Sequence, residues 1–219
     1  MLRRKIIKKL MLAAAALTGV LLSPITSATI IGGAITGGDA LTQGGSFIDY
    51  GNAPAGLIVG NDTLQNPNLY GFNEDQNIFL AADLPVDVGT SLSIAAGQEV
   101  ASHYIFFDPQ NLISVEGWVD FDSEILGIIT SRDNLSNSDY LLNNNVTYLN
   151  PGLRGLEPNQ DDAWIDPLNS NRLGVSFVAS TPGDYIRVIT ARSPQADVPV
   201  PATLSLMLLG MMLLRRKVR

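Results

Sequence analysis

The chain has 219 residues and no cysteine, and its charged residues are unevenly distributed. The two ends hold nine of the 14 lysines and arginines, whereas all 21 acidic residues lie between Asp39 and Asp197. The body from Thr29 to Asp197 therefore has five arginines, no lysine and a net charge of −16. Such a charge repels nucleic acid and anionic lipid and attracts cations, which excludes a nucleic-acid partner. The lack of cysteine excludes disulfides and cysteine-based zinc or catalytic sites.

The N-terminus has the three parts of a secretory signal peptide. The first nine residues carry five cations, Leu10–Leu22 is an apolar stretch rich in alanine and leucine, and six small, turn-prone residues follow. Thr26 and Ala28 are small residues at the third and first positions before a cleavage point. We therefore expect a signal peptide over residues 1–28, export by the Sec translocon, and cleavage by signal peptidase between Ala28 and Thr29. An uncleaved anchor is the alternative.

The body reads as a lead-in followed by many short strands. Residues 29–45 are rich in Gly, Thr and Ala with little periodicity, and we interpret them as an irregular lead-in or linker. In residues 46–192, short apolar runs alternate with Asn, Asp, Gly and Pro, which are turn residues. Ten runs are candidate strands: 47–50, 57–59, 78–80, 91–95, 103–107, 114–122, 125–130, 146–149, 172–179 and 185–191.

The run 114–122 has the clearest pattern. It alternates an apolar side with a polar or charged side, namely Val115, Gly117, Val119 and Phe121 against Glu116, Trp118, Asp120 and Asp122. Strict alternation indicates a half-buried antiparallel strand. The stretch 131–142 has enough periodicity for one or two helical turns, with Ser131 or Asp133 as the cap. These patterns predict a mainly β fold, an antiparallel β-sandwich of jelly-roll-like type over residues 46–192.

After a short linker, 193–198, the chain ends in a proline pair, an apolar run and a basic tail. A helix from Val198 to Leu214 would be about 25 Å long, slightly less than the ~30 Å hydrocarbon thickness of a bilayer. Its flanking cations favour the cytoplasmic side, and they are Arg215, Arg216, Lys217 and Arg219. We therefore expect a C-terminal transmembrane helix. The alternative, a buried core helix, would show polar residues at helical spacing, which this run lacks.

This tail resembles the PEP-CTERM sorting signal of Gram-negative bacteria, in which a proline-containing motif, an apolar segment and an arginine-rich end are recognised by an exosortase. The motif here is Pro199-Val200-Pro201-Ala202, with Val200 where the commonest version has an acidic residue. The resemblance covers residues 199–219. It implies an inner-membrane intermediate, cleavage near the prolines, and release to the cell surface or extracellular space, commonly alongside exopolysaccharide.

Catalytic residues are scarce in this sequence. His103 is the only histidine, so a serine triad or a histidine metal cluster would depend on it alone. Its neighbour Ser102 lacks the flanking glycines of a nucleophile elbow. We expect His103 to be a strand residue at the edge of the sandwich, and we expect no catalytic residues.

Carboxylates offer a second kind of site. On a strand, Asp120, Asp122 and Glu124 would share one face, where like charges are unfavourable unless water or a cation separates them. Calcium prefers oxygen ligands of this kind. Asp161 and Asp162 form a loop candidate of the same type. These five residues are therefore candidate calcium ligands, with a solvated acidic surface as the alternative; no other cofactor is expected.

Two tryptophans are candidate carbohydrate contacts. Trp118 alternates onto the acidic face of its strand, and Trp164 follows the Asp161–Asp162 pair. Either ring is able to stack on a sugar, or instead to pack on the second sheet or anchor a loop. The sequence favours an exported, non-catalytic surface or matrix protein, with a structural or adhesive role in a biofilm or exopolysaccharide matrix. A calcium-dependent carbohydrate-binding module is the second hypothesis and a secreted hydrolase the third.

Overall fold

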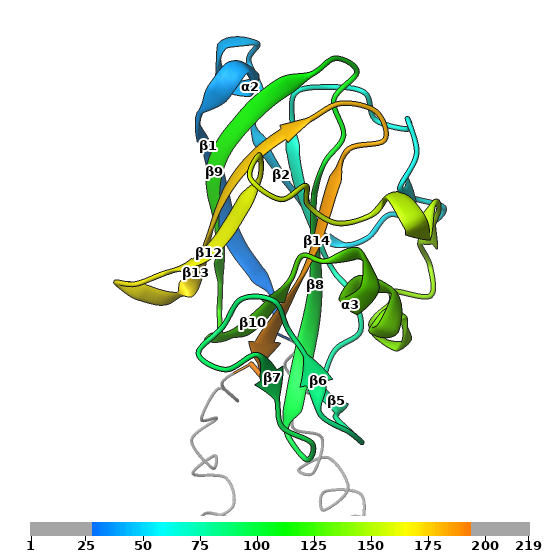
Figure 1. Cartoon of the computed structure of the whole chain (residues 1–219), viewed down its shortest axis with the longest axis vertical. Coiled ribbons are helices and arrows are strands. Elements are labelled where there is room, and N and C mark those ends of the chain that lie inside the picture. The colour runs from blue at the N-terminus through cyan, green and yellow to red at the C-terminus, as the bar shows by residue number, and fades with distance from the viewer. Residues whose placement is uncertain (1–27, 194–219) are drawn as a thin grey trace, which may run out of the picture. The chain divides into compact units, whose positions relative to one another are not determined.

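The computed structural model describes residues 28–193, and over this range the fold is mainly β with several antiparallel sheets (Figure 1). Residues 1–27 of the predicted signal peptide lie outside the described residues, as do linker residues 194–198 and the sorting signal 199–219 with its transmembrane helix and basic tail. No helix within residues 28–193 has the length and hydropathy that a membrane span requires.

One large sheet has four antiparallel strands in the order β1-β9-β13-β12. The strands are β1 (Ile30–Gly37), β9 (Ile113–Phe121), β12 (Asp162–Asp166) and β13 (Asn169–Ala179). The alternation predicted for β9 is confirmed, since Val115, Val119 and Phe121 are fully buried while Glu116 is exposed. This sheet therefore has one apolar face and one face toward solvent.

The other large sheet has six strands. The order is β10-β14-β8-β4-β2, with the short β5 also paired to β8, and all neighbours are antiparallel except β2 and β4. The strands are β2 (Phe47–Asn52), β4 (Leu69–Asn73), β5 (Ile78–Phe79), β8 (Glu99–Phe107), β10 (Ile125–Ile129) and β14 (Asp184–Ala191). β8 and β14 are almost entirely buried, as expected for strands covered on both faces.

The two large sheets share one hydrophobic core. Val119 and Phe177 of the four-stranded sheet belong to the same cluster as Ile105 and Ile186 of the six-stranded sheet. The opposite face of the six-stranded sheet is covered by shorter elements, of which α3 lies at the right of Figure 1 and β6 and β7 at its lower end. They are β3 (Ile58–Val59), β6 (Leu84–Pro85), β7 (Ser93–Ile94), α3 (Arg132–Asn137), η1 (Asp139–Leu141) and β11 (Thr147–Tyr148). The short helix η2 (Pro151–Leu153) follows β11 along the chain.

Each of the ten predicted runs overlaps an observed strand, and the helical turns predicted over 131–142 are α3 and η1. Ser131 is the N-cap of α3, and its side chain accepts a hydrogen bond from the Asn134 amide. Four strands, β1, β4, β6 and β12, were not predicted.

The prediction that residues 29–45 are irregular was wrong, because they contain β1 and the short helix α2 (Gly38–Thr42). β1 pairs with the edge of β9 over most of its length. Its glycines hide the strand pattern, yet they serve packing: the Phe47 ring lies against Gly33, where a β-carbon would overlap it. The sheet therefore begins almost at Thr29.

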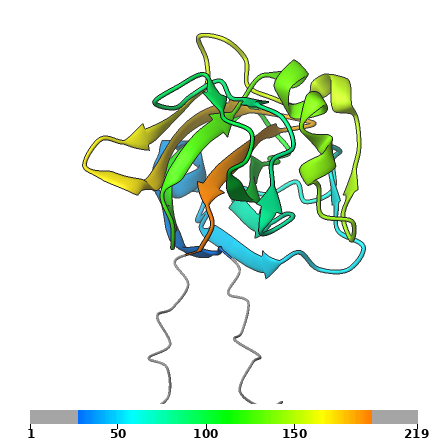
Figure 2. The ribbon, with the colours of Figure 1, turned by 90° about the horizontal axis from the view of Figure 1, so that it is seen from below.

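The two ends of the described chain meet at Asp122, just after β9. The Thr29 amide donates to Asp122 Oδ1 at 3.0 Å, and the Ser193 hydroxyl donates to Oδ2 at 2.7 Å. Figure 2 shows the first and last strands close together at this end of the fold. Asp122 therefore holds both chain ends against the turn that follows β9.

Candidate functional site

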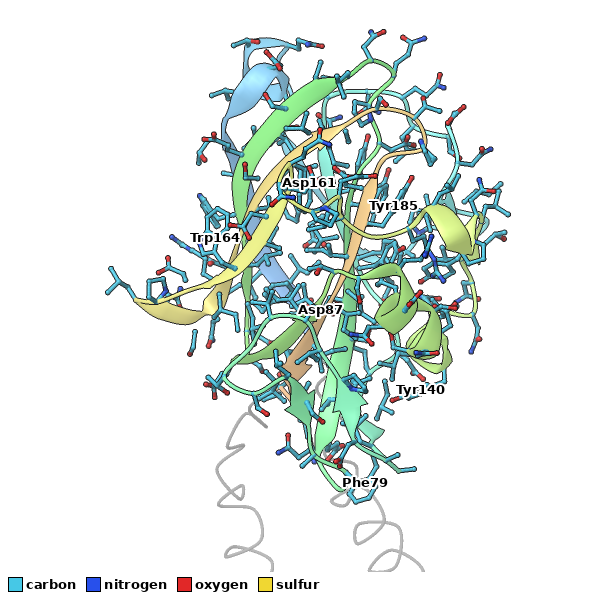
Figure 3. The ribbon with its side chains drawn as sticks, viewed as in Figure 1. Phe79, Asp87, Tyr140, Asp161, Trp164 and Tyr185 are labelled. Atoms are coloured by element: carbon cyan, nitrogen blue, oxygen red, sulfur yellow. The ribbon has the colours of Figure 1, made fainter. Side chains whose placement is uncertain are left out.

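The outer face of the four-stranded sheet carries both tryptophans in one row. Trp118 on β9 is paired with Gly174 on β13, and Gly174 is paired in turn with Trp164 on β12. A β-carbon at Gly174 would overlap the Trp164 ring, so the absence of a side chain there lets the ring lie against the sheet. Trp164 is nevertheless 40% exposed and projects from the left side of the molecule in Figure 3. It is therefore a strand residue with an accessible ring, rather than a loop anchor.

Trp118 also points outward, away from the second sheet, but its ring is covered by an ion pair. The Arg172 guanidinium lies 4.2 Å from the Trp118 ring centroid, a cation–π arrangement. The same guanidinium donates to both Asp120 oxygens, at 2.7 and 2.8 Å. Beside the exposed Trp164 ring there is thus a fixed set of donors and acceptors, which is the pattern that recognises hydroxyl groups next to an apolar ring face.

The structure does not bring Asp120, Asp122 and Glu124 together as predicted. The reason is that β9 ends at Phe121, so strand alternation does not continue to Glu124. Asp120 is paired with Arg172, and Asp122 binds Thr29 and Ser193. Glu124 is exposed. Three carboxylates expected on one face therefore have three different environments.

Among the described residues, the carboxylates that do converge are Glu157, Asp161 and Asp184. One oxygen from each lies within 4.8 Å of those from the other two. Of these, the sequence pointed only to Asp161; its neighbour Asp162 is exposed on β12. Asp161 lies just before β12, Glu157 is in the preceding loop, and Asp184 begins β14 in the other sheet. The group thus bridges the two large sheets.

This carboxylate group borders a cleft of about 640 Å³, whose lining includes Glu157 and Asp184. Asp161 is held firmly beside it, because the Glu157 amide donates to Oδ2 and the Val178 amide to Oδ1, both at 2.8 Å. Asp184 is only 3% exposed, and its Oδ2 has no hydrogen-bond partner. Burial, together with the charges of Asp161 and Glu157, raises the pKa of Asp184 to about 9.

His103 is fully buried on β8, a central strand of the six-stranded sheet, so its predicted position at an edge was wrong. One ring nitrogen lies 2.8 Å from Asn73 Oδ1 and the other 3.1 Å from the Thr190 hydroxyl. Burial lowers the pKa of the imidazole to about 3, so it is neutral near pH 7. In this position the ring contacts no solvent and reaches no substrate.

A second hollow, of about 500 Å³, lies on the side of the six-stranded sheet that carries α3. Phe79 and Tyr140 border it and are 70% and 59% exposed. Figure 3 labels both residues in the lower part of the fold. Its lining also includes Asn134 and Asn137. It is an exposed aromatic surface distinct from the tryptophan row.

A comparison of the chain with protein-family models, with curated proteins and with solved structures found no match in any of the three.

Proposed function

We propose that this chain is an exported, non-catalytic protein of the cell surface or extracellular matrix, which adheres to polysaccharide through the outer face of its four-stranded sheet. The targeting part of the proposal rests on the sequence alone: a signal peptide for Sec export, and a PEP-CTERM-like tail for exosortase processing after an inner-membrane stage. The adhesive part rests on the tryptophan row. A jelly-roll-like β-sandwich is the fold type we propose, supported by the core that the two large sheets share.

One observation carries the adhesive function: an accessible Trp164 ring, held against Gly174, beside the Arg172–Asp120 pair. An exposed aromatic residue alone is ordinary on a protein surface. Here the ring lies directly over Gly174, which has no side chain, so it packs against the sheet and still exposes part of its surface. The neighbouring ion pair supplies both donors and acceptors in rigid geometry.

The charge of the body indicates which polysaccharide fits. The outer face carries Glu116, Asp120 and Asp162 with only Arg172 of opposite sign among the residues named there. Together with the net charge of −16, this repels uronic acids and sulfated sugars. We therefore propose a neutral glycan as the ligand. His103 supports a non-catalytic role, because it is fully buried and is the single histidine of the chain.

A glycan array with the full chain purified in detergent tests this proposal. We expect binding to neutral glycans and none to acidic ones. Trp164→Ala should weaken binding about tenfold or more, because a stacking contact of roughly 1.4 kcal/mol is lost. Trp164→Phe should retain part of the affinity.

Phe79→Ala is the matched control, since it removes an aromatic ring that is even more exposed, but outside the tryptophan row. It should leave glycan binding unchanged. If Phe79→Ala abolished binding while Trp164→Ala did not, the second hollow would be the binding surface. If acidic glycans bound as well as neutral ones, the charge argument would be wrong.

The carboxylate group of Glu157, Asp161 and Asp184 favours two further candidate functions. A calcium-dependent carbohydrate-binding module would lose glycan binding on addition of a chelator. A secreted hydrolase would use Asp184, whose raised pKa suits a general acid, with Glu157 as its partner in the cleft. It would release reducing sugar from a glycan, and Asp184→Asn would abolish that activity.

A further inference from the structure

The three carboxylates of the cleft come from both large sheets and face one another. Asp161 precedes β12 of the four-stranded sheet, Asp184 begins β14 of the six-stranded sheet, and Glu157 lies in the loop between η2 and β12. Their nearest oxygens are within 4.8 Å of one another. Two ligands on opposite sides of one calcium ion lie about 5 Å apart, because each Ca–O distance is about 2.3–2.6 Å. One calcium ion can therefore contact all three.

Within residues 28–193, no arginine forms an ion pair with any of these three carboxylates. Each of the five arginines in this range is paired with other acidic residues: Arg132 with Asp133, Arg154 with Asp139, Arg172 with Asp120, Arg187 with Glu74 and Asp139, and Arg192 with Glu99. The body has no lysine. None of these ion pairs includes Glu157, Asp161 or Asp184, although Arg132 and Arg154 line the same cleft.

A second observation also points to a bound ion at this group. It is a buried oxygen without a protein donor, and it does not depend on how many carboxylates converge. Asp184 is 97% buried, and no protein N–H or hydroxyl donates to its Oδ2; the Glu157 carboxyl lies close enough to share a hydrogen bond with Asp184 only when one of the two is protonated. Buried polar atoms are nearly always satisfied, so such an atom indicates a bound water or ion that completes the structure. Asp161 is positioned by two backbone amides but keeps further lone pairs on both oxygens. The adjoining cleft is open to water, which can fill the remaining coordination positions.

We propose that Glu157, Asp161 and Asp184 bind one calcium ion that links the two large sheets at the cleft. The ion would act as a cross-link: Asp161 is fixed to β13 through the Val178 amide, and Asp184 is paired across to Phe107 on β8. This inference goes beyond the proposed adhesive function, because the site does not include the tryptophan row and its test does not require a glycan.

Thermal unfolding and calorimetric titration of the full chain in detergent test the site. Calcium at about a hundred times its Kd should raise the Tm by roughly 5–10 °C. Magnesium at equal ionic strength should raise it clearly less, because magnesium gives up its water reluctantly and requires shorter bonds.

Three substitutions locate the ion. Asp184→Asn and Asp161→Asn should each remove the calcium-induced shift, whereas Asp162→Asn should keep it. Asp162→Asn is the matched control, because it removes the same charge one residue away, at an exposed position of β12. Glu157→Gln changes an exposed loop residue and should weaken calcium binding at least tenfold. This variant tests the site even if a substitution of the buried Asp184 prevents folding.

Several results would overturn the proposal. Equal shifts with calcium, magnesium and matched sodium chloride would mean charge screening alone. A shift that survives Asp184→Asn, or that disappears in Asp162→Asn, would place the ion elsewhere. Sugar hydrolysis without calcium binding would make the carboxylates an acid–base pair instead.

The calcium site and the glycan surface can be tested separately. Loss of glycan binding in Trp164→Ala, with the calcium-induced Tm shift intact, would support a calcium site that is independent of the tryptophan row.

Discussion

Replacing Arg187 by methionine should strongly destabilise the protein. Arg187 lies on β14 with no exposed surface, and Glu74 opposite it is also fully buried in its side chain. Its Nε donates to Glu74 Oε2 at 2.6 Å and its Nη2 to Oε1 at 3.1 Å. Its Nη1 donates to the Ser138 hydroxyl and the Leu135 carbonyl. One guanidinium thus joins β14, the end of β4 and the α3–η1 segment.

The expected loss follows from what Glu74 retains. Without Arg187 its carboxylate keeps hydrogen bonds from the Ser102 and Tyr148 hydroxyls, but no buried cation. Removing one partner of a buried ion pair typically costs about 3–5 kcal/mol. Since a domain of about 150–250 residues loses roughly 2–4 °C in Tm per kcal/mol, Arg187→Met should lower the Tm by about 6–20 °C.

Urea and thermal unfolding measure this loss, with two comparison variants. Glu74→Gln/Arg187→Met should be more stable than Arg187→Met alone, because it removes the unpaired buried charge. Arg172→Met makes the same substitution in a bidentate pair that is partly exposed, and it should lower the Tm clearly less than Arg187→Met does, because water solvates the Asp120 carboxylate that remains. A loss below about 1 kcal/mol for Arg187→Met, or a double variant less stable than the single one, would refute the reasoning.

Two further predictions concern pH and processing. The folded-state pKa of His103 is about 3, below its ordinary value near 6.5, so its contribution to stability is complete above pH 6.5 and is lost as the pH falls toward 3. This contribution amounts to about 5 kcal/mol in total. Between pH 7 and pH 4, the free energy of unfolding measured in urea should fall less steeply with decreasing pH in His103→Gln than in the unsubstituted protein, and the difference in slope should correspond to about one proton. If signal peptidase cleaves after Ala28, the new α-amino group of Thr29 lies 3.0 Å from Asp122 Oδ1, so Asp122→Asn should lower the Tm of the cleaved protein more than that of the precursor. Equal losses in the two forms would argue against that cleavage position.

The strands were predictable where side chains alternate and hidden where glycine or short length removed the pattern. β9 was evident because its buried and outward residues alternate over the whole strand. β1 was missed because Gly32, Gly33 and Gly37 carry no hydropathy signal, although Gly33 is required by the close approach of Phe47. β12 was missed because it has only five residues and one of its two outward residues is Trp164, which weakens the alternation.

The carboxylate site was only half predictable, since sequence proximity gave Asp161 but not its partners. Asp184 stands in a Pro-Gly-Asp stretch that reads as an ordinary turn. Asp184 begins β14 in the six-stranded sheet, and it lies close to Asp161 only because this sheet packs against the four-stranded sheet that contains β13. That packing depends on the strand order of both sheets, which no local pattern reveals. In the opposite direction, Asp120, Asp122 and Glu124 were grouped by extending strand spacing past Phe121, where the strand ends. Local spacing therefore predicts a site only within one element.

The distribution of the five arginines explains why the cleft is where an external cation matters. Arg187 and Arg154 are almost fully buried and neutralise Glu74 and Asp139. Most of the remaining acids are exposed, where water and salt screen their repulsion. Asp108 and Asp184 are buried acids without an arginine. Asp108 accepts hydrogen bonds from the Thr63 and Leu64 amides, whereas Asp184 faces two carboxylates. If calcium occupies the proposed site, the stability of the protein depends there on the calcium concentration of its surroundings, whereas the buried Glu74 is neutralised by Arg187 within the fold.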